Sequence, residues 1–162
     1  MAVDWERIMA AEVWSVLPEG QRLPWLFTPF ERVGPLEFGM THDQVQVAVQ
    51  GFLRVAAWQG TSGGDGWADF WLEQPPGAGF SGPAVTAYYD ASMALAGIAL
   101  NALRGPQLTL GGMRLVGQTP SRLEDEFSDY LAAHSMELRY SQHADPCSPH
   151  LVLQPGIVIT AR

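Results

Sequence analysis

Hydrophobic and polar positions along the chain predict helices and strands in a mixed order. Residues 4–17 place apolar side chains at helical spacing, with Asp4 as a possible cap and Pro18 as a stop. A loop through residues 23–29, which contain two prolines, is expected to follow. We expect residues 1–33 to form a helical extension that covers an edge or an end of the core.

A strand-turn-helix unit is predicted from residue 34 onward. Leu36 and Phe38 lie on one face of a short strand that runs into Gly39. Thr41, followed three residues later by Gln44, matches the capping box of a helix start. The predicted helix buries one apolar stripe, formed by Val45, Ala48, Val49 and Phe52.

The same pattern returns in the second half of the chain. Pro120 stands at the first helical position, where its missing N–H costs nothing. The matched turn and cap residues are Gly34, Gly39 and Thr41 in the first unit and Gly112, Gly117 and Thr119 in the second. The second helix repeats the apolar spacing with Leu123, Phe127, Tyr130 and Leu131. The pattern predicts a tandem duplication.

Strand-like runs separated by turn formers follow each helix. An antiparallel meander is predicted at residues 53–59, 66–74, 84–90 and 93–101, and fewer strands are predicted at residues 136–142, 150–154 and 157–161. The predicted fold is therefore α+β, with one antiparallel sheet and helices packed on one of its faces. It consists of a first repeat at residues 34–110 and a truncated second repeat at residues 111–162, which together form one compact unit.

The string Phe38-Gly39-Met40-Thr41, with a strand meander and a second copy after it, resembles the β-lactamase inhibitory protein fold. The same short unit is also similar to bacterial immunity-type proteins. The resemblance implies helices on one face of a sheet whose other face binds a protein, and hence inhibition or neutralisation of that partner. β-Lactamase itself is not carried over as the target. The chain departs from the family in lacking paired cysteines and an export signal, and its second copy reads Val116-Gly117-Gln118-Thr119.

Composition supports a globular protein. The chain has 162 residues, of which 47% are apolar and 16% charged, so it can bury a core and disorder is not expected. The single Cys147 and the absence of a basic, apolar leader predict a cytoplasmic protein. No apolar run is long enough to predict a membrane span. The usage of arginine without lysine is typical of a GC-rich bacterial genome.

Charge excludes several classes of function. The net charge is −8 and all nine basic residues are scattered arginines, which disfavours binding to DNA, RNA or a membrane surface. The absence of lysine excludes a Schiff-base enzyme and a phosphate-binding loop of the NTPase type. The string at residues 60–64 fits a nucleophile elbow, but the alternation after it indicates a hairpin loop. We therefore predict no enzyme activity and no cofactor.

A candidate partner-binding face follows from the alternation along residues 66–74. Ala68, Phe70 and Leu72 point to one side of this predicted strand, and two tryptophans with an acid point to the other. The candidate partner-binding residues are Arg54, Trp58, Trp67, Asp69, Trp71 and Tyr88, and Thr86 and Asp90 have the parity to join them. Tryptophan, tyrosine and arginine dominate protein-binding hot spots. The alternative is that the N-terminal helix or the second repeat covers this face as core.

Two further clusters have alternative interpretations. Glu124, Asp125, Glu126 and Asp129 either cap a solvated helix start or form an acidic patch for a basic partner. Residues 143–150 contain two histidines, a cysteine and an aspartate, but their spacing matches no standard zinc site, so no metal is predicted.

The sequence thus predicts a protein-binding module, an inhibitor or immunity-like factor that acts through the open face of its sheet. One alternative is a small-molecule-binding protein or minor enzyme, with an aromatic pocket between the repeats near His134 or His143. Homo-oligomerisation through the apolar strand at residues 93–100 is compatible with either function.

Overall fold

A computed structural model of the chain describes residues 16–60, 66–77, 80, 82–135 and 150–153. In these residues the chain forms two five-stranded sheets and two α-helices, which confirms the predicted α+β class. No helix in this part of the chain is long and apolar enough to cross a membrane. Most of the helix predicted at residues 4–17 lies outside the described ranges, and its last two positions are not helical.

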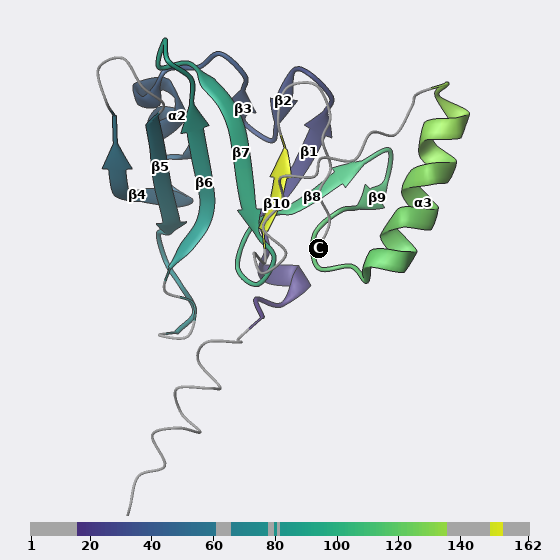
Figure 1. Cartoon of the computed structure of the whole chain (residues 1–162). Helices are drawn as coiled ribbons and strands as arrows, with labels where there is room; N and C mark the ends of the chain where they lie inside the picture. Colours follow the sequence, from purple (N-terminus) through teal and green to yellow (C-terminus); the bar gives the residue numbers. More distant parts are fainter. Residues whose placement is uncertain (1–15, 61–65, 78–79, 81, 136–149, 154–162) are drawn as a thin grey trace, which may run out of the picture.

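The sheet with the longer strands contains the predicted four-stranded meander, and β10, a strand of the predicted second repeat, pairs with its edge. Its strands pair in the order β10-β7-β6-β5-β4, and each neighbouring pair is antiparallel. Figure 1 shows β4 at the left edge of this sheet, with β5, β6 and β7 following in turn. The bounds are β4 Leu53–Gln59, β5 Gly66–Leu72, β6 Pro83–Tyr89, β7 Leu95–Asn101 and β10 His150–Leu153, so the predicted strands here are confirmed to within a few residues. We call this the meander sheet.

A second sheet, built from short strands, corrects the prediction of a single antiparallel sheet. Its strand order is β3-β2-β1-β8-β9, and β1 and β8 run parallel. The strands are β1 Pro24–Thr28, β2 Arg32–Val33, β3 Leu36–Glu37, β8 Gln107–Leu110 and β9 Met113–Arg114. The predicted loop at residues 23–29 is therefore wrong: Trp25 and Phe27 alternate as buried positions of β1, and Pro24 is tolerated because it is the first residue of the strand.

Both predicted helices begin where the sequence places them. α2 spans His42–Val49, and its N-cap Thr41 forms a complete capping box with Gln44. α3 spans Pro120–Ala133 after Thr119, whose side chain makes no capping hydrogen bond. The matched glycines before the two helices share left-handed backbone angles, with φ of +94° at Gly39 and +72° at Gly117. The two turns are thus alike in geometry, while the duplication itself stays a prediction.

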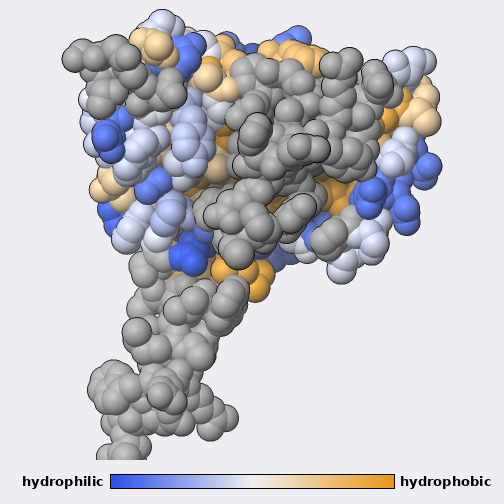
Figure 2. All heavy atoms as spheres, viewed as in Figure 1, coloured by the Kyte–Doolittle hydropathy of each residue, from blue (hydrophilic) through white to orange (hydrophobic). Residues whose placement is uncertain are grey.

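One core connects both sheets and both helices. The meander sheet contributes Phe70 and Tyr89, β1 contributes Trp25, and α2 contributes Val45. From α3 the buried residues are Leu123, Phe127 and Leu131. Figure 1 places α2 near β4 and α3 beyond β9, at opposite ends of the molecule. In Figure 2 the outer side of α3 is largely hydrophilic, which agrees with one buried stripe on an otherwise solvated helix.

A buried arginine that sequence reasoning missed ties the start of the described chain to the connection between β7 and β8. The side chain of Arg22, just after the short 3₁₀ helix η1 (Glu19–Gln21), is buried. Its guanidinium donates to the carbonyl oxygens of Ala102 at 2.7 Å and Gly105 at 2.9 Å. Burial lowers the pKa of Arg22 below its usual value, and the Glu19 carboxylate opposes that shift. These bonds supply hydrogen-bond donors to two backbone carbonyls of the connection.

Candidate functional site

Most of the predicted binding residues share one face of the meander sheet. In the register of the strands Trp67 lies opposite Tyr88, and Arg54 lies opposite Trp71. Residues directly opposite each other in an antiparallel pair point to the same side of the sheet. We call this side the aromatic face, and its predicted members are Arg54, Trp67, Asp69, Trp71 and Tyr88.

The other side of the same strands is the core. Along β5 the positions between the aromatic-face residues are fully buried, with Ala68 at 0% and Phe70 at 1% exposure. The neighbouring strand repeats this with buried Val85 and Ala87. The aromatic face is therefore the side of the sheet turned away from these core residues.

Trp58 lies on the opposite side from the one predicted. A β-bulge between Val55 and Ala57 adds one residue to β4 and reverses the parity of the positions after it. Trp58 therefore pairs with the core-facing Ala68, and its indole stacks on the imidazole of His42 with ring centroids 3.9 Å apart. The simple alternation used for the prediction contains no sign of the bulge.

Asp90 also does not join the aromatic face. β6 ends at Tyr89, and Asp90 lies in the turn that follows. Its carboxylate accepts hydrogen bonds from the backbone N–H of Ser92 at 2.9 Å and of Ala94 at 3.1 Å. These bonds lower the pKa of Asp90, with the Ser92 hydroxyl as the largest cause. Asp90 shapes the turn between β6 and β7.

The aromatic face is arranged in three rows that run across the strands. The central row has small and polar side chains, and large side chains stand on both sides of it. The central row is Ala57, Asp69, Thr86 and Ala99; one flanking row is Gln59, Trp67, Tyr88 and Gly97; the other is Arg54, Trp71 and Pro83. Tyr88 is 44% exposed, whereas Thr86 at 8% and Ala99 at 1% are buried, so exposure differs strongly between positions of this face.

Asp69 is the charged group of the central row. The hydroxyl of Thr86 donates to its Oδ1 at 2.6 Å. None of the ion pairs formed within the described residues includes Asp69. Burial raises the pKa of Tyr88, and the negative charge of Asp69 raises it further. A negative potential therefore extends from Asp69 over the neighbouring row.

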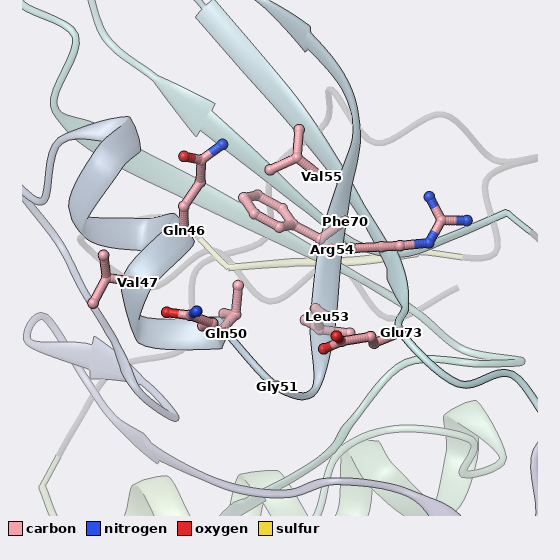
Figure 3. Close-up of a pocket in the computed structure, with 10 residues that line it drawn as sticks. Gln46, Val47, Gln50, Gly51, Leu53, Arg54, Val55, Phe70 and Glu73 are labelled. Carbon is pink, nitrogen blue, oxygen red and sulfur yellow. The ribbon is translucent and has the colours of Figure 1, made fainter.

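Arg54 marks the border of the aromatic face. The guanidinium carbon of Arg54 lies 5.3 Å from the centroid of the Trp71 ring, which is a cation–π geometry. Figure 3 shows the Arg54 side chain turned away from α2. The arginine is exposed while Trp67, Asp69 and Trp71 are half-buried.

A cluster on the core side of the sheet was not predicted. The Nδ1 atom of His42, the first residue of α2, lies 3.0 Å from the hydroxyl oxygen of Tyr89, which is 1% exposed. Burial lowers the pKa of His42, and Asp43 opposes that shift. Burial also raises the pKa of Tyr89 well above its usual value. The His42 imidazole thus packs against the rings of Trp58 and Tyr89 and joins the start of α2 to the meander sheet.

A pocket of about 430 Å³ lies between α2 and the edge strand β4. Its floor includes the buried residues Val49, Leu53 and Phe70. Figure 3 shows Gln46 on α2 and Gln50 directly after the end of this helix, and both line the pocket. This pocket lies within the first unit, whereas the predicted aromatic pocket lay between the two units, and Phe70 is the aromatic residue in its lining.

The remaining predicted groups are spread over other parts of the molecule. On α3, Glu124, Asp125 and Asp129 are exposed, and Glu126 forms an ion pair with Arg122 at 2.8 Å. His134 stacks on Tyr130 at the end of that helix. The predicted metal loop lies outside the described residues except for the backbone of its last position, and the described part contains no group of three or more candidate metal ligands.

Comparison of the chain with protein-family models, curated proteins and solved structures gave no match. The resemblance to the β-lactamase inhibitory protein fold therefore stays a prediction.

Proposed function

We propose that this protein is a protein-binding module, an inhibitor or immunity-like factor, which engages its partner through the aromatic face. The observation that supports the proposal is the grouping of Trp67, Trp71, Tyr88 and Arg54 on one side of a sheet whose other side is core. Large aromatic and guanidinium side chains contribute most of the binding free energy in protein interfaces. The single cysteine supports a reducing compartment, the cytoplasm.

The physical basis is a rigid and contoured surface. β5 is paired on both sides, so Trp67 and Trp71 are held on a hydrogen-bonded backbone and lose little entropy on binding. The small side chain of Ala57 and the polar Asp69, placed between Trp67 and Trp71 in the register, give the face a contour that a partner can match. The net charge of −8 favours a basic partner, because opposite charge speeds encounter and suppresses wrong pairings.

A second candidate function rests on the pocket between α2 and β4. Its volume of about 430 Å³ falls in the range of small-molecule sites. Its buried apolar floor and the amides of Gln46 and Gln50 would suit a mainly apolar ligand with one hydrogen-bonding group. This function predicts that Gln46→Leu weakens ligand binding, while Tyr88→Ala, which changes an aromatic-face residue outside the pocket lining, leaves it unchanged.

Self-association through β7 is not part of the proposal. The strand predicted for it lies between β6 and β10 and pairs with both, so it offers no free edge. Its side chains are also almost all buried.

The proposal is tested with a variant of the aromatic face and a matched control. The double variant Arg54→Ala/Tyr88→Ala removes two exposed side chains of the face. Leu26→Ala, at a position 71% exposed on the other sheet, is the control. We expect the wild type and the control to retain the same stoichiometric partner from lysate of the source organism, and the double variant to lose it.

Binding is then measured by calorimetry with the purified partner. A loss of at least about tenfold in affinity for the double variant, equivalent to about 1.4 kcal/mol, is expected from side chains of hot-spot type. Equal affinity of all three proteins, or no retained partner for the wild type, would contradict the proposal.

A further inference from the structure

We propose that the central row of the aromatic face is a binding site for one arginine side chain of the partner, seated on Asp69 between Trp67 and Trp71. This inference rests on the proposed function and deepens it, because it names the chemistry that the partner must present. Three observations carry it: the spacing of the two tryptophans, the charge of Asp69, which forms no ion pair with any described residue, and the small side chain of Ala57 beside it.

The spacing of Trp67 and Trp71 along β5 leaves room for a planar side chain between their indole rings. Trp67 and Trp71 stand two residues before and after Asp69 on β5, on the same face. At the rise of an extended strand each tryptophan Cα lies about 7 Å from the Cα of Asp69. An inserted side chain over Asp69 would therefore have an indole on either side. The cross-strand neighbour of Asp69 on β4 is Ala57, which has no bulk to fill this space.

The negative charge of Asp69 favours a positively charged group in the bound partner. Thr86 occupies one acceptor position of the carboxylate with a hydrogen bond of 2.6 Å. A carboxylate has about four acceptor positions, so further donors can be accommodated. No ion pair among the described residues includes Asp69, although the side chain is half-buried. A partner that covered this face with apolar groups alone would bury an unpaired carboxylate at a substantial cost.

A guanidinium fits this site better than an ammonium group. It is planar, binds a carboxylate through two parallel N–H donors, and stacks on aromatic rings. The face already contains one such contact, because the guanidinium of Arg54 lies 5.3 Å from the ring of Trp71. The raised pKa of Tyr88, to which Asp69 contributes, agrees with a negative potential over the same region.

The test uses the full chain and a defined probe. Indole N–H resonances of Trp67 and Trp71, assigned with Trp67→Phe and Trp71→Phe, are followed by NMR while acetyl-Gly-Arg-Gly-amide is added. The matched probe is the citrulline peptide, which has the same shape but no charge. We expect both resonances to shift saturably with the arginine peptide, to shift several-fold less with a lysine peptide, and not to shift saturably with the citrulline peptide.

Asp69→Asn keeps an acceptor oxygen for Thr86 and removes the charge. We expect it to weaken binding of the arginine peptide by about tenfold or more, as the loss of a charge-assisted pair implies. Asp43→Asn, an exposed acid on α2, should leave the titration unchanged. An equal response to arginine and citrulline peptides in the wild type, or no saturable response to either, would overturn the inference even if Asp69→Asn failed to fold.

The same variant separates this inference from the proposed function. Loss of the partner by Arg54→Ala/Tyr88→Ala, together with full partner affinity of Asp69→Asn, would refute the arginine site and leave the protein-binding face intact. Retention of the partner by all variants would refute the proposed function itself.

Discussion

The two strand-turn-helix units begin in the same way and continue differently. Each unit has a β-hairpin at one end of the second sheet, which has the strand order β3-β2-β1-β8-β9. In each unit a glycine with positive φ and a threonine precede the helix. α2 has eight residues and a complete capping box. α3 has fourteen residues, starts with Pro120 and has no side-chain cap. The comparison indicates that local signals determine where a helix begins, while its continuation depends on tertiary packing.

The source of stability differs between the two helices. α2 ends where Gly51, with φ of +90°, turns the chain into β4, so its length is limited by the strand that follows. α3 continues because Leu123, Phe127 and Leu131 recur at helical spacing and are all buried. A short helix then depends more on its cap, and a long one more on its apolar stripe.

The largest expected effect tests the apolar stripe. Phe127→Ala should destabilise the protein by about 3–5 kcal/mol, because it removes a buried aromatic ring from α3. The matched position in α2 is Val49, where alanine removes less buried surface and should cost about 2 kcal/mol. Urea denaturation followed by circular dichroism measures both. An equal cost for the two variants would contradict the proposed difference.

The second-largest expected effect tests the glycine with positive φ that precedes the helix in both units. Gly39→Ala and Gly117→Ala each place a side chain at a positive φ, which costs about 1–2 kcal/mol. Within the described part of the chain, no heavy atom lies within 4 Å of the position that the new Cβ would take at Gly39, so the cost there reflects backbone conformation. Similar losses of unfolding free energy at both glycines would support the equivalence of the two turns. A loss of unfolding free energy at only one of the two glycines would contradict the equivalence of the turns.

A smaller effect separates the two caps. Thr41→Ala should cost about 1 kcal/mol, because the N–H of Gln44 loses its acceptor. Thr119→Ala should cost much less, since its side chain makes no capping hydrogen bond. Thr41→Ser, which keeps the hydroxyl, is the control for the first variant. Thermal unfolding of the three proteins at one pH decides between these expectations.

The smallest expected effect is the contribution of His42 to the pH dependence of the unfolding free energy. His42 has no counterpart in the second unit, where Pro120 stands, and its pKa in the folded protein is lowered by burial. The unfolded chain therefore takes up the proton first, so stability is highest above the usual histidine pKa of about 6.5 and falls as the pH drops below it. His42→Gln should lose this part of the pH dependence. Urea unfolding of both proteins between pH 7.5 and 5 measures the difference, and parallel pH profiles would contradict it.

Sequence patterns predicted the meander sheet well and the rest of the fold less well. Period-two alternation bounded by glycine and proline is a local signal, and β4 through β7 follow it closely. β1 was missed because Pro24 and Pro29 are typical of a loop, and its pairing with β8 depends on residues far along the chain. No local pattern reports a parallel partner at that distance.

The candidate face was predicted except where the strand is irregular. Trp67, Asp69 and Trp71 follow one strand without interruption, so their shared side could be read from parity alone. Trp58 follows the bulge near Ala56, which parity cannot detect. Asp90 follows the end of β6, where an acid that accepts backbone N–H groups forms a turn. Irregular backbone, rather than a wrong type of residue, accounts for both errors.

The parallel pairing of β1 with β8 has a consequence for synthesis of the chain. β1 emerges from the ribosome early, yet Trp25 finds its partner Leu108 only after β4 through β7 of the meander sheet have been made. Until then an apolar strand edge has no complement, and closing so long a loop is slow. The N-terminal strand is therefore among the last elements to settle, and nascent chains that stall before β8 would be the ones most prone to aggregate.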